Sequence, residues 1–271
     1  MEREMEGFKK ELIHQRKDNK TIKSYIRDVE LFLQYIDNKP LSDIDYFDIE
    51  DYKTFLLQQG YKVTSINRKM VAINRFITYC GYKVEVRQEK VHMQNFLDNT
   101  LTTDEVQAMV DKAEELKDYR AKALILTLYY TGMRISECLS ITVNNISKDY
   151  ITILGKGKKF RNVLVPKKLK SVWNEYMDYR VDKSNKLFTG QKGAITRQCA
   201  DLIIKKYARL AGVDVKKAHM HNLRHVFCKN LADNNVSIDV IAELAGHNSL
   251  DTSRIYTRKT KQELLNIIEN L

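Results

Sequence analysis

The sequence predicts a mainly α-helical protein of two domains that contains one small β-hairpin. Two prolines and ten glycines occur in 271 residues, and apolar residues recur at three- and four-residue spacing along most of the chain. Residues 149–165 differ, because they form short alternating runs of β-prone residues. The length suits two ordinary domains, and a hydrophobic fraction of 43% is enough to build a core in each.

The chain is strongly basic, with 46 Lys and Arg against 35 Asp and Glu and a net charge of +11. Residues 1–100 carry 17 basic and 16 acidic side chains, so nearly all of the excess lies in the rest of the chain, with 29 basic and 19 acidic side chains. A positive surface can simply keep a protein soluble, but this distribution favours a nucleic-acid partner.

The cysteines are scattered singly, without a C-x-x-C pair or the spacing of a metal site: Cys80, Cys138, Cys199 and Cys228. We expect buried thiols in a reducing compartment. No apolar run approaches the ~20 residues needed to span a bilayer, and the amino terminus is charged from its second residue. A cytoplasmic protein without a membrane segment is therefore expected.

Two amphipathic helices are predicted in the first domain, over residues 21–36 and 64–80. Their apolar stripes consist of Tyr25, Val29, Phe32, Leu33 and Ile36 in the first helix and Ile66, Met70, Ile73, Phe76 and Ile77 in the second. Polar side chains outside these stripes are expected to face a phosphate backbone: Lys20, Thr21, Lys23, Arg68, Lys69 and Arg75. A plain solvated helix face is the alternative for each of these positions.

The first domain is expected over residues 1–88, a linker over 89–100 and the second domain over 101–271. Residues 84–101 lack helical periodicity and separate two helical regions. Helical patterning resumes at Thr102, which forms the pattern of a capping box with Glu105 three residues later.

The non-helical island at residues 149–165 predicts a β-hairpin. Its runs YITIL and FRNVLV are separated by GKGKK, in which glycines suit the positive φ angles of a turn. Lys156 is expected at the tip of this turn, where an isolated lysine would normally be solvated. For Lys158, Lys159 and Arg161 we expect contacts with phosphates or with solvent.

Basic residues at helix ends in the second domain favour phosphate binding. Arg134 follows an apolar helix that ends at Gly132 and opens the next predicted helix, so its guanidinium is expected near a helix amino terminus. A salt bridge to Glu137 is the alternative and is compatible with phosphate binding. His221 and Arg224 lie three residues apart on one predicted helix, so they share a face and can reach one phosphate together.

Tyr256 lies nine residues after His247, which itself follows an apolar helix closed by Gly246. A phenol of pKa ~10 needs a cationic setting to attack as phenolate, and guanidinium groups match phosphate oxygens bidentately. This set favours phosphoryl transfer through a covalent phosphotyrosine. A packing role is the alternative for a tyrosine before an amphipathic segment, here one that bears Leu264, Leu265, Ile268 and Leu271.

Four strings carry a resemblance to a known family: TGMRISECLSI around Arg134, ILGKGKKFRNVLVP around Lys156, HMHNLRHVF around His221 and Arg224, and LAGHNSLDTSRIY from His247 to Tyr256. In this order and spacing they resemble the tyrosine recombinases, the integrase and Xer class of site-specific DNA recombinases. The resemblance covers Thr102 to about Tyr256 and extends more loosely over the first part of the chain.

The resemblance implies an amino-terminal helical core-binding domain of the SAM-like kind, with helices 21–36 and 64–80 facing DNA, followed by a catalytic domain. It implies six catalytic residues: Arg134, Lys156, His221, Arg224, His247 and Tyr256. The implied reaction passes through a 3′-phosphotyrosyl link and needs no metal, nucleotide or other cofactor.

The partners implied by the resemblance are double-stranded DNA with paired inverted-repeat sites and three further copies of the chain. Such a homotetramer exchanges strands through a Holliday junction. The terminal apolar segment fits a helix that docks on a neighbouring protomer, and folding back on its own chain is the alternative.

Three other functions stay open at this point. A type IB-like topoisomerase uses a comparable residue set without a partner site, a catalytically silent DNA-binding protein can keep the fold, and a basic helical adaptor would have no DNA role. Among recombinases, the chain is expected to start almost directly at the core-binding domain, without an additional arm-binding domain. This suits a Xer-like resolver, a transposon resolvase or a compact integrase of a mobile element.

Overall fold

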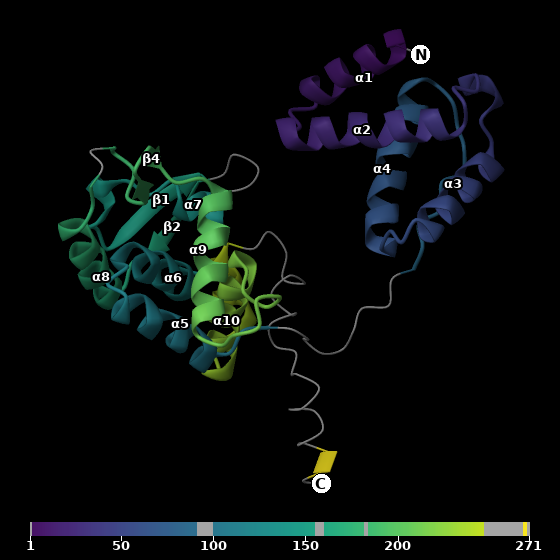
Figure 1. Ribbon diagram of the computed structural model, residues 1–271. Coiled ribbons are helices and arrows are strands. Elements are labelled where there is room, and N and C mark those ends of the chain that lie inside the picture. The colour runs from purple at the N-terminus through teal and green to yellow at the C-terminus, as the bar shows by residue number, and fades with distance from the viewer. Residues whose placement is uncertain (1, 91–99, 155–159, 182–183, 247–267, 270–271) are drawn as a thin grey trace. The chain divides into compact units, whose positions relative to one another are not determined.

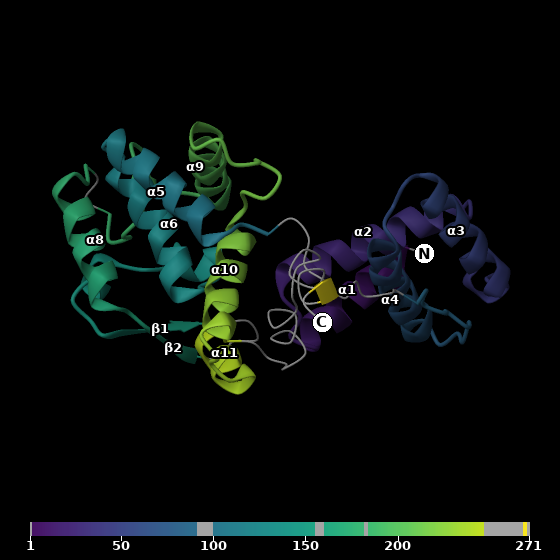
Figure 2. The same ribbon diagram turned by 90° about the horizontal axis from the view of Figure 1, so that it is seen from below.

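The computed structural model describes residues 2–90, 100–154, 160–181, 184–246 and 268–269, and the structural statements below concern these residues. The chain divides into two compact units, residues 1–93 and 94–271, each of which is described by itself. Figure 1 labels most of the helices and strands of both units, and Figure 2 also labels α11. The predicted mainly α-helical fold with a small β-hairpin is confirmed.

The first unit is a bundle of helices. Its elements are α1 (Glu2–His14), α2 (Asn19–Tyr35), the 3-10 helix η1 (Leu41–Asp43), α3 (Tyr46–Gln58) and α4 (Val63–Tyr79). The core lies mainly where α2 packs along α4, and Val29, Phe32, Ile66 and Ile73 are fully buried there. The Asp18 side chain begins α2 by accepting hydrogen bonds from the backbone N–H groups of the first turn.

The two amphipathic helices of the first unit match the predicted stripes, with differences at their edges. The stripe of α4 is buried throughout, whereas Tyr25 of α2 and Ile36, the residue after α2, are only partly buried. The buried faces of these two helices also contain one charged residue each: Asp28 of α2 is 2% exposed, and Lys69 of α4 is 4% exposed. The expectation that Lys69 lies outside the buried face of its helix is therefore wrong.

The second unit is built around the apolar helix α6. Its elements are α5 (Thr103–Glu115), α6 (Tyr119–Thr131), α7 (Ile135–Cys138), the 3-10 helix η2 (Val143–Asn145), β1 (Tyr150–Leu154), β2 (Phe160–Leu164), α8 (Lys167–Asp178), β3 (Thr189–Gly190), β4 (Gly193–Ala194), α9 (Arg197–Leu210), α10 (Met220–Asp233) and α11 (Ile238–Ala245). Helices α5, α8, α9 and α10 all pack on α6. The buried Trp173 indole of α8 donates a hydrogen bond to the Thr127 hydroxyl of α6 at 2.8 Å.

The ends of two helices in this unit follow the predicted chemistry. Thr102 and Glu105 form the capping box at the start of α5. Gly132 ends α6 with φ +57°, in the left-handed region that favours glycine. A Cβ atom on Gly132 would lie 2.3 Å from the Phe227 ring of α10, so this turn also permits close packing of the two helices.

Strands β1 and β2 form the predicted antiparallel hairpin. Ile153 pairs with Arg161 and Ile151 pairs with Val163, and these residues belong to the inward-facing set of each strand. The outward face carries exposed apolar side chains, including Phe160 at 73% exposure. Figure 2 shows β2 beside α11. Helix α11 is the last labelled helix of this unit.

All four cysteines are free thiols, but their burial differs from the expectation. Cys138 and Cys228 are buried, whereas Cys80 and Cys199 are partly exposed. Across the described ranges, no helix combines the length and the apolar character that crossing a membrane requires.

Candidate active site

Arg134 lies at the turn between α6 and α7, where the left-handed conformation of Gly132 redirects the chain. Its Nη1 donates to Glu137 Oε1 at 3.0 Å, and its backbone N–H donates to Glu137 Oε2 at 2.9 Å. Its Nη2 donates to the Gly246 carbonyl at 3.1 Å. The predicted salt bridge to Glu137 is therefore present, and one third of the Arg134 side chain remains exposed for a further partner.

The helix that follows Arg134 is shorter than expected. α7 spans a single turn, Ile135–Cys138, so the dipole of a long helix does not contribute at Arg134. The local order comes instead from Glu137, whose side chain is only 3% exposed. Burial alone would raise the pKa of Glu137, but the backbone N–H of Arg134 and the charge of Arg161 outweigh it and hold that pKa below its ordinary value.

Arg161 was expected to contact phosphates or solvent, and its position corrects that expectation. The side chain is 15% exposed and points inward from β2. Its Nη2 donates to Glu137 Oε2 at 3.0 Å, and its Nη1 donates to the Leu244 carbonyl at 2.9 Å. Arg161 therefore joins Arg134 as a second cation on one buried carboxylate.

Arg224 and His221 share helix α10, as predicted, but their exposure differs greatly. Arg224 is 1% exposed, and its Nη1 donates to the Gly132 carbonyl at 2.6 Å. This bond ties Arg224 to the turn that leads into Arg134 two residues later. Of the two residues, Arg224 is buried and His221 is exposed.

His221 is solvent-exposed in α10, yet the surrounding protein still lowers its pKa below the ordinary value of 6.5. Partial burial has the largest effect, and the positive charges of Arg224, His219 and Arg134 add to it. His221 is therefore near enough to Arg224 and Arg134 for their charges to lower its pKa. A neutral imidazole at pH 7 can accept a proton there.

The neighbouring histidines, His219 and His225, are both partly buried. His219 is the residue before α10, and burial lowers its pKa. The His225 ring meets the His221 ring edge-on, with 4.5 Å between the ring centroids.

The remaining predicted catalytic and phosphate-contacting residues of this domain lie outside the described residues: Lys156, Lys158, Lys159, His247 and Tyr256. The structure thus brings together Arg134, His221 and Arg224 and adds Glu137 and Arg161. The sequence predicts Glu137 as a partner of Arg134, but it does not show that Arg161 shares the same carboxylate.

The predicted phosphate-facing residues of the first unit have mixed positions. Lys20, Lys23 and Arg75 are exposed, and Thr21 is partly exposed with its hydroxyl bonded to Asp18.

Arg68 is exposed but contacts Asp28 and Ser24. Lys69 is buried, with its Nζ 2.8 Å from Asp28 Oδ1. Of the predicted residues, Lys23, Arg68 and Lys69 line a basic hollow of about 360 Å³ between α2 and α4. Its other lining residues are Ser24, Arg27, Asp28, Tyr61 and Ser65.

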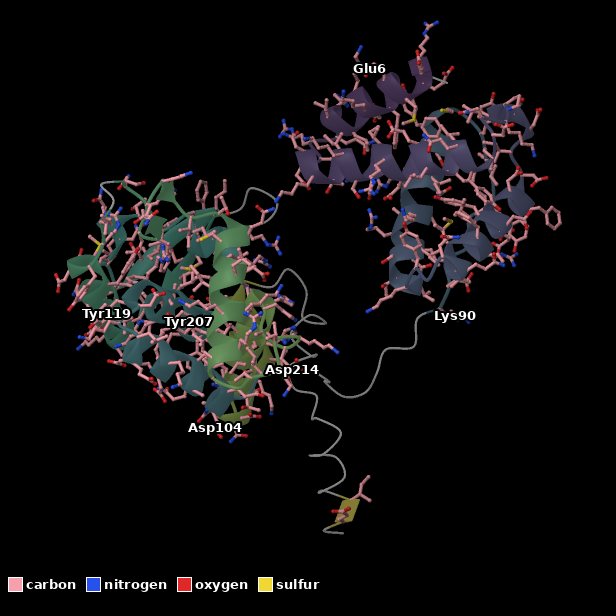
Figure 3. All side chains as sticks on the ribbon, in the orientation of Figure 1. Glu6, Lys90, Asp104, Tyr119, Tyr207 and Asp214 are labelled. Atoms are coloured by element: carbon pink, nitrogen blue, oxygen red, sulfur yellow. The ribbon has the colours of Figure 1, made fainter. Side chains whose placement is uncertain are left out.

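A larger cavity of about 650 Å³ lies away from this chemistry. Tyr119 and Tyr207, both labelled in Figure 3, line it together with Tyr179 and Arg120. Tyr119 is the first residue of α6, whereas Arg134 follows the other end of that helix. A helix of this length separates its ends by about 20 Å, so the cavity is no part of the candidate active site.

The chain matches the phage integrase family over residues 99–263 and the phage integrase N-terminal SAM-like domain over residues 5–80. Tyrosine recombinase XerA of Pyrococcus furiosus is 32% identical over 230 residues, which cover 80% of this chain and 79% of that protein. Tyrosine recombinase XerD of Pasteurella multocida is 30% identical over 273 residues, which cover 92% of this chain and 90% of that protein.

Solved structures show the same fold. The crystal structure of XerA recombinase has a TM-score of 0.56 and 25% identity, covering 99% of this chain and 98% of that one. The post-cleavage complex of XerH site-specific recombinase bound to palindromic difH substrate has a TM-score of 0.76 and 23% identity, covering 91% of this chain and 78% of that one.

The arginine and histidine cluster, on a helical domain that follows a SAM-like domain, defines a DNA strand-transfer enzyme of the tyrosine recombinase class. The chain belongs to the phage integrase family and is a site-specific DNA recombinase.

Proposed function

We propose that this recombinase cuts and rejoins DNA through a 3′-phosphotyrosyl intermediate formed by Tyr256. The observation that carries this proposal is the clustering of Arg134, His221 and Arg224 within the family match, which also spans Lys156, His247 and Tyr256. Arginines near a neutral histidine suit an in-line attack on a phosphodiester, because the cations stabilise the charge on the non-bridging oxygens.

In the proposed reaction, the Tyr256 oxygen bonds to phosphorus while the bond from phosphorus to the 5′ oxygen breaks. His221 takes the phenol proton, a role supported by its lowered pKa. Lys156 gives a proton to the departing 5′ oxygen, and His247 donates a hydrogen bond to the phosphate together with Arg134 and Arg224. A 5′ hydroxyl from a partner duplex then reverses these steps, so no metal or nucleotide is needed.

Residues 1–88 act in this proposal as the core-binding domain, joined by residues 89–100 to the catalytic domain at 101–271. The proposed DNA contacts of α2 and α4 are made by Lys20, Thr21, Lys23, Arg68 and Arg75. For Lys23 and Arg68 this role is supported by the basic hollow that they line. Lys158 and Lys159, in the segment between β1 and β2, are also proposed to contact DNA. Lys69 is excluded from this set, because it is buried against Asp28.

The proposed assembly is a homotetramer on paired inverted-repeat DNA sites, acting in the cytoplasm. A lambda integrase crystal structure that shares the fold shows a tetramer bound to a Holliday junction. The terminal apolar segment, residues 264–271, is proposed to dock on a neighbouring protomer. Deleting the residues after Thr260 should spare binding to one site and reduce synapsis in a gel-shift assay, and full recombination by the truncated chain would argue against trans docking.

Covalent trapping tests the proposed nucleophile. Wild type and Tyr256→Phe are incubated with pooled nicked duplexes from AT-rich mobile-element and chromosomal DNA, denatured, and assayed for protein-linked strands, which are then sequenced. We expect adducts with wild type alone, joined at one recurrent inverted repeat, while the variant still binds DNA. Adducts that survive in Tyr256→Phe would refute the assignment, and scattered adducts would indicate a topoisomerase.

A further inference from the structure

Arg161 connects three elements of the catalytic domain through one guanidinium. It extends from the inward face of β2, donates to Glu137 in α7, and donates to the Leu244 carbonyl in α11. A guanidinium can do this because its donors form a rigid planar fork, whereas a lysine ammonium is a single point charge. Only 15% of the side chain is exposed, so little of it is available to DNA.

The end of α11 is held by two arginines. The last carbonyls of a helix lack partners within the helix, and cations there are stabilising. Arg161 binds the Leu244 carbonyl, and Arg134 binds the Gly246 carbonyl. Because both arginines also bind Glu137, this carboxylate links the position of Arg134 to that of the helix end. The next residue in the chain is His247.

Gly246 shows how closely Arg161 approaches the helix end. A Cβ atom at this position would lie 2.5 Å from Arg161 Cδ, 2.6 Å from Nε and 2.8 Å from Cζ. Gly246 also has φ +68°, which glycine adopts without strain. The arginine stem therefore packs directly on a backbone that bears no side chain, and the hydrogen bonds at its end prevent it from moving aside freely.

We propose that Arg161 is a positioning residue of the active site: it braces β2 against Glu137 and the end of α11, so that Arg134 keeps its place during strand cleavage. The link to cleavage rests on the function proposed above. The brace itself belongs to the free protein. A phosphate contact by Arg161 is the competing role, and the two roles predict different measurements.

The first test is hydrogen exchange of the free protein, comparing wild type with Arg161→Lys and Arg161→Met. Asn162→Ala is the matched control, because Asn162 is the exposed neighbour on β2. We expect amides at the end of α11 to exchange ~10-fold faster or more in Arg161→Met, less so in Arg161→Lys, and at the wild-type rate in Asn162→Ala. Unchanged exchange in Arg161→Met would overturn the brace. If Arg161→Met fails to fold, Arg161→Lys carries the comparison.

The second test uses the nicked duplex recovered by covalent trapping. A positioning role leaves DNA affinity and its salt dependence at the wild-type level, but lowers the single-turnover rate of adduct formation at saturating DNA by about 100-fold in Arg161→Met, with partial recovery in Arg161→Lys. A phosphate contact would instead reduce the slope of log affinity against log salt by ~1 and leave the saturated rate unchanged, which would overturn the proposal. Absence of adducts with wild type would contradict the proposed function, while hydrogen exchange would still decide the brace.

Discussion

Partial burial is the main cause of the lowered pKa of His221, and nearby positive charges add to it. Arg224, His219 and Arg134 all disfavour its protonation, in addition to partial burial. In the unfolded chain His221 takes up a proton as pH falls through its ordinary value of 6.5, while the folded protein keeps it neutral. The contribution of His221 to the free energy of unfolding is therefore present above pH 6.5 and is lost as pH falls toward the folded pKa.

The same pKa predicts the pH dependence of cleavage. Because neutral His221 accepts the Tyr256 proton in the proposed reaction, the rate of adduct formation should hold at pH 6.5 and fall only below it. Single-turnover rates on a trapped nicked duplex, measured from about pH 5 to about pH 8 at constant ionic strength, check this. In His221→Gln the rate should drop ~10²-fold or more, and that acid limb should disappear. A limb that persists unchanged in His221→Gln would assign it to another group.

At the scale of elements, glycines end two helices that lead into the site. Gly132 and Gly246 both have positive φ and both lie against a large side chain, Phe227 in one case and Arg161 in the other. The chain can turn at these points because glycine has no Cβ. Their carbonyls also accept hydrogen bonds from Arg224 and Arg134, so each turn helps to place an arginine.

Gly132→Ala should therefore cost more stability than an alanine at a comparable but open turn. Gly212 supplies the control, with φ +71° and nothing within 4 Å of an added Cβ. We expect Gly212→Ala to lose about 1 kcal/mol from backbone strain alone and Gly132→Ala to lose a further ~1–3 kcal/mol from overpacking against Phe227. Urea unfolding monitored by Trp173 fluorescence measures both changes. Equal losses would show that Phe227 moves aside without cost.

Much of this arrangement could be predicted from the sequence, because it depends on local rules. The capping box at Thr102, the glycine at the end of α6 and the alternation of the hairpin all follow from residue type and spacing. The alternation even places Arg161 on the same face as Val163. The charge of Arg161 nevertheless predicts an exposed position. The two partners that stabilise it inside, the Glu137 carboxylate and the Leu244 carbonyl, lie 24 and 83 residues away in the sequence.

The prediction that Lys69 faces outward is wrong for a similar reason. It lies three residues after Ile66 and four before Ile73, which is the spacing of the buried stripe of α4. Asp28 occupies the matching place in α2, three residues after Tyr25 and four before Phe32. A charged residue in each stripe, of opposite sign, is a signal for a buried pair, but it can be recognised only when the two helices are known to pack together.

At the scale of the whole molecule, each unit has its own hydrophobic core. The core of the first unit is formed by residues between Phe8 and Ile77, and the large core of the second by residues between Leu101 and Val226. The chain has a single tryptophan, Trp173, which is buried in the second core. Its fluorescence therefore reports on the second unit alone, whereas far-ultraviolet circular dichroism reports on the helices of both.

The buried pair of Asp28 and Lys69 lets these two signals be separated. Asp28→Asn leaves the Lys69 ammonium buried without an anion, which should cost the first unit about 3–5 kcal/mol. Glu6→Gln is the control, since the exposed pair of Glu6 and Lys9 should contribute less than ~1 kcal/mol. In urea, Asp28→Asn should shift part of the dichroism transition to lower concentration and leave the midpoint of Trp173 fluorescence in place, because each core unfolds as its own cooperative unit. A fluorescence midpoint that shifts together with the dichroism would show instead that the two cores unfold as one.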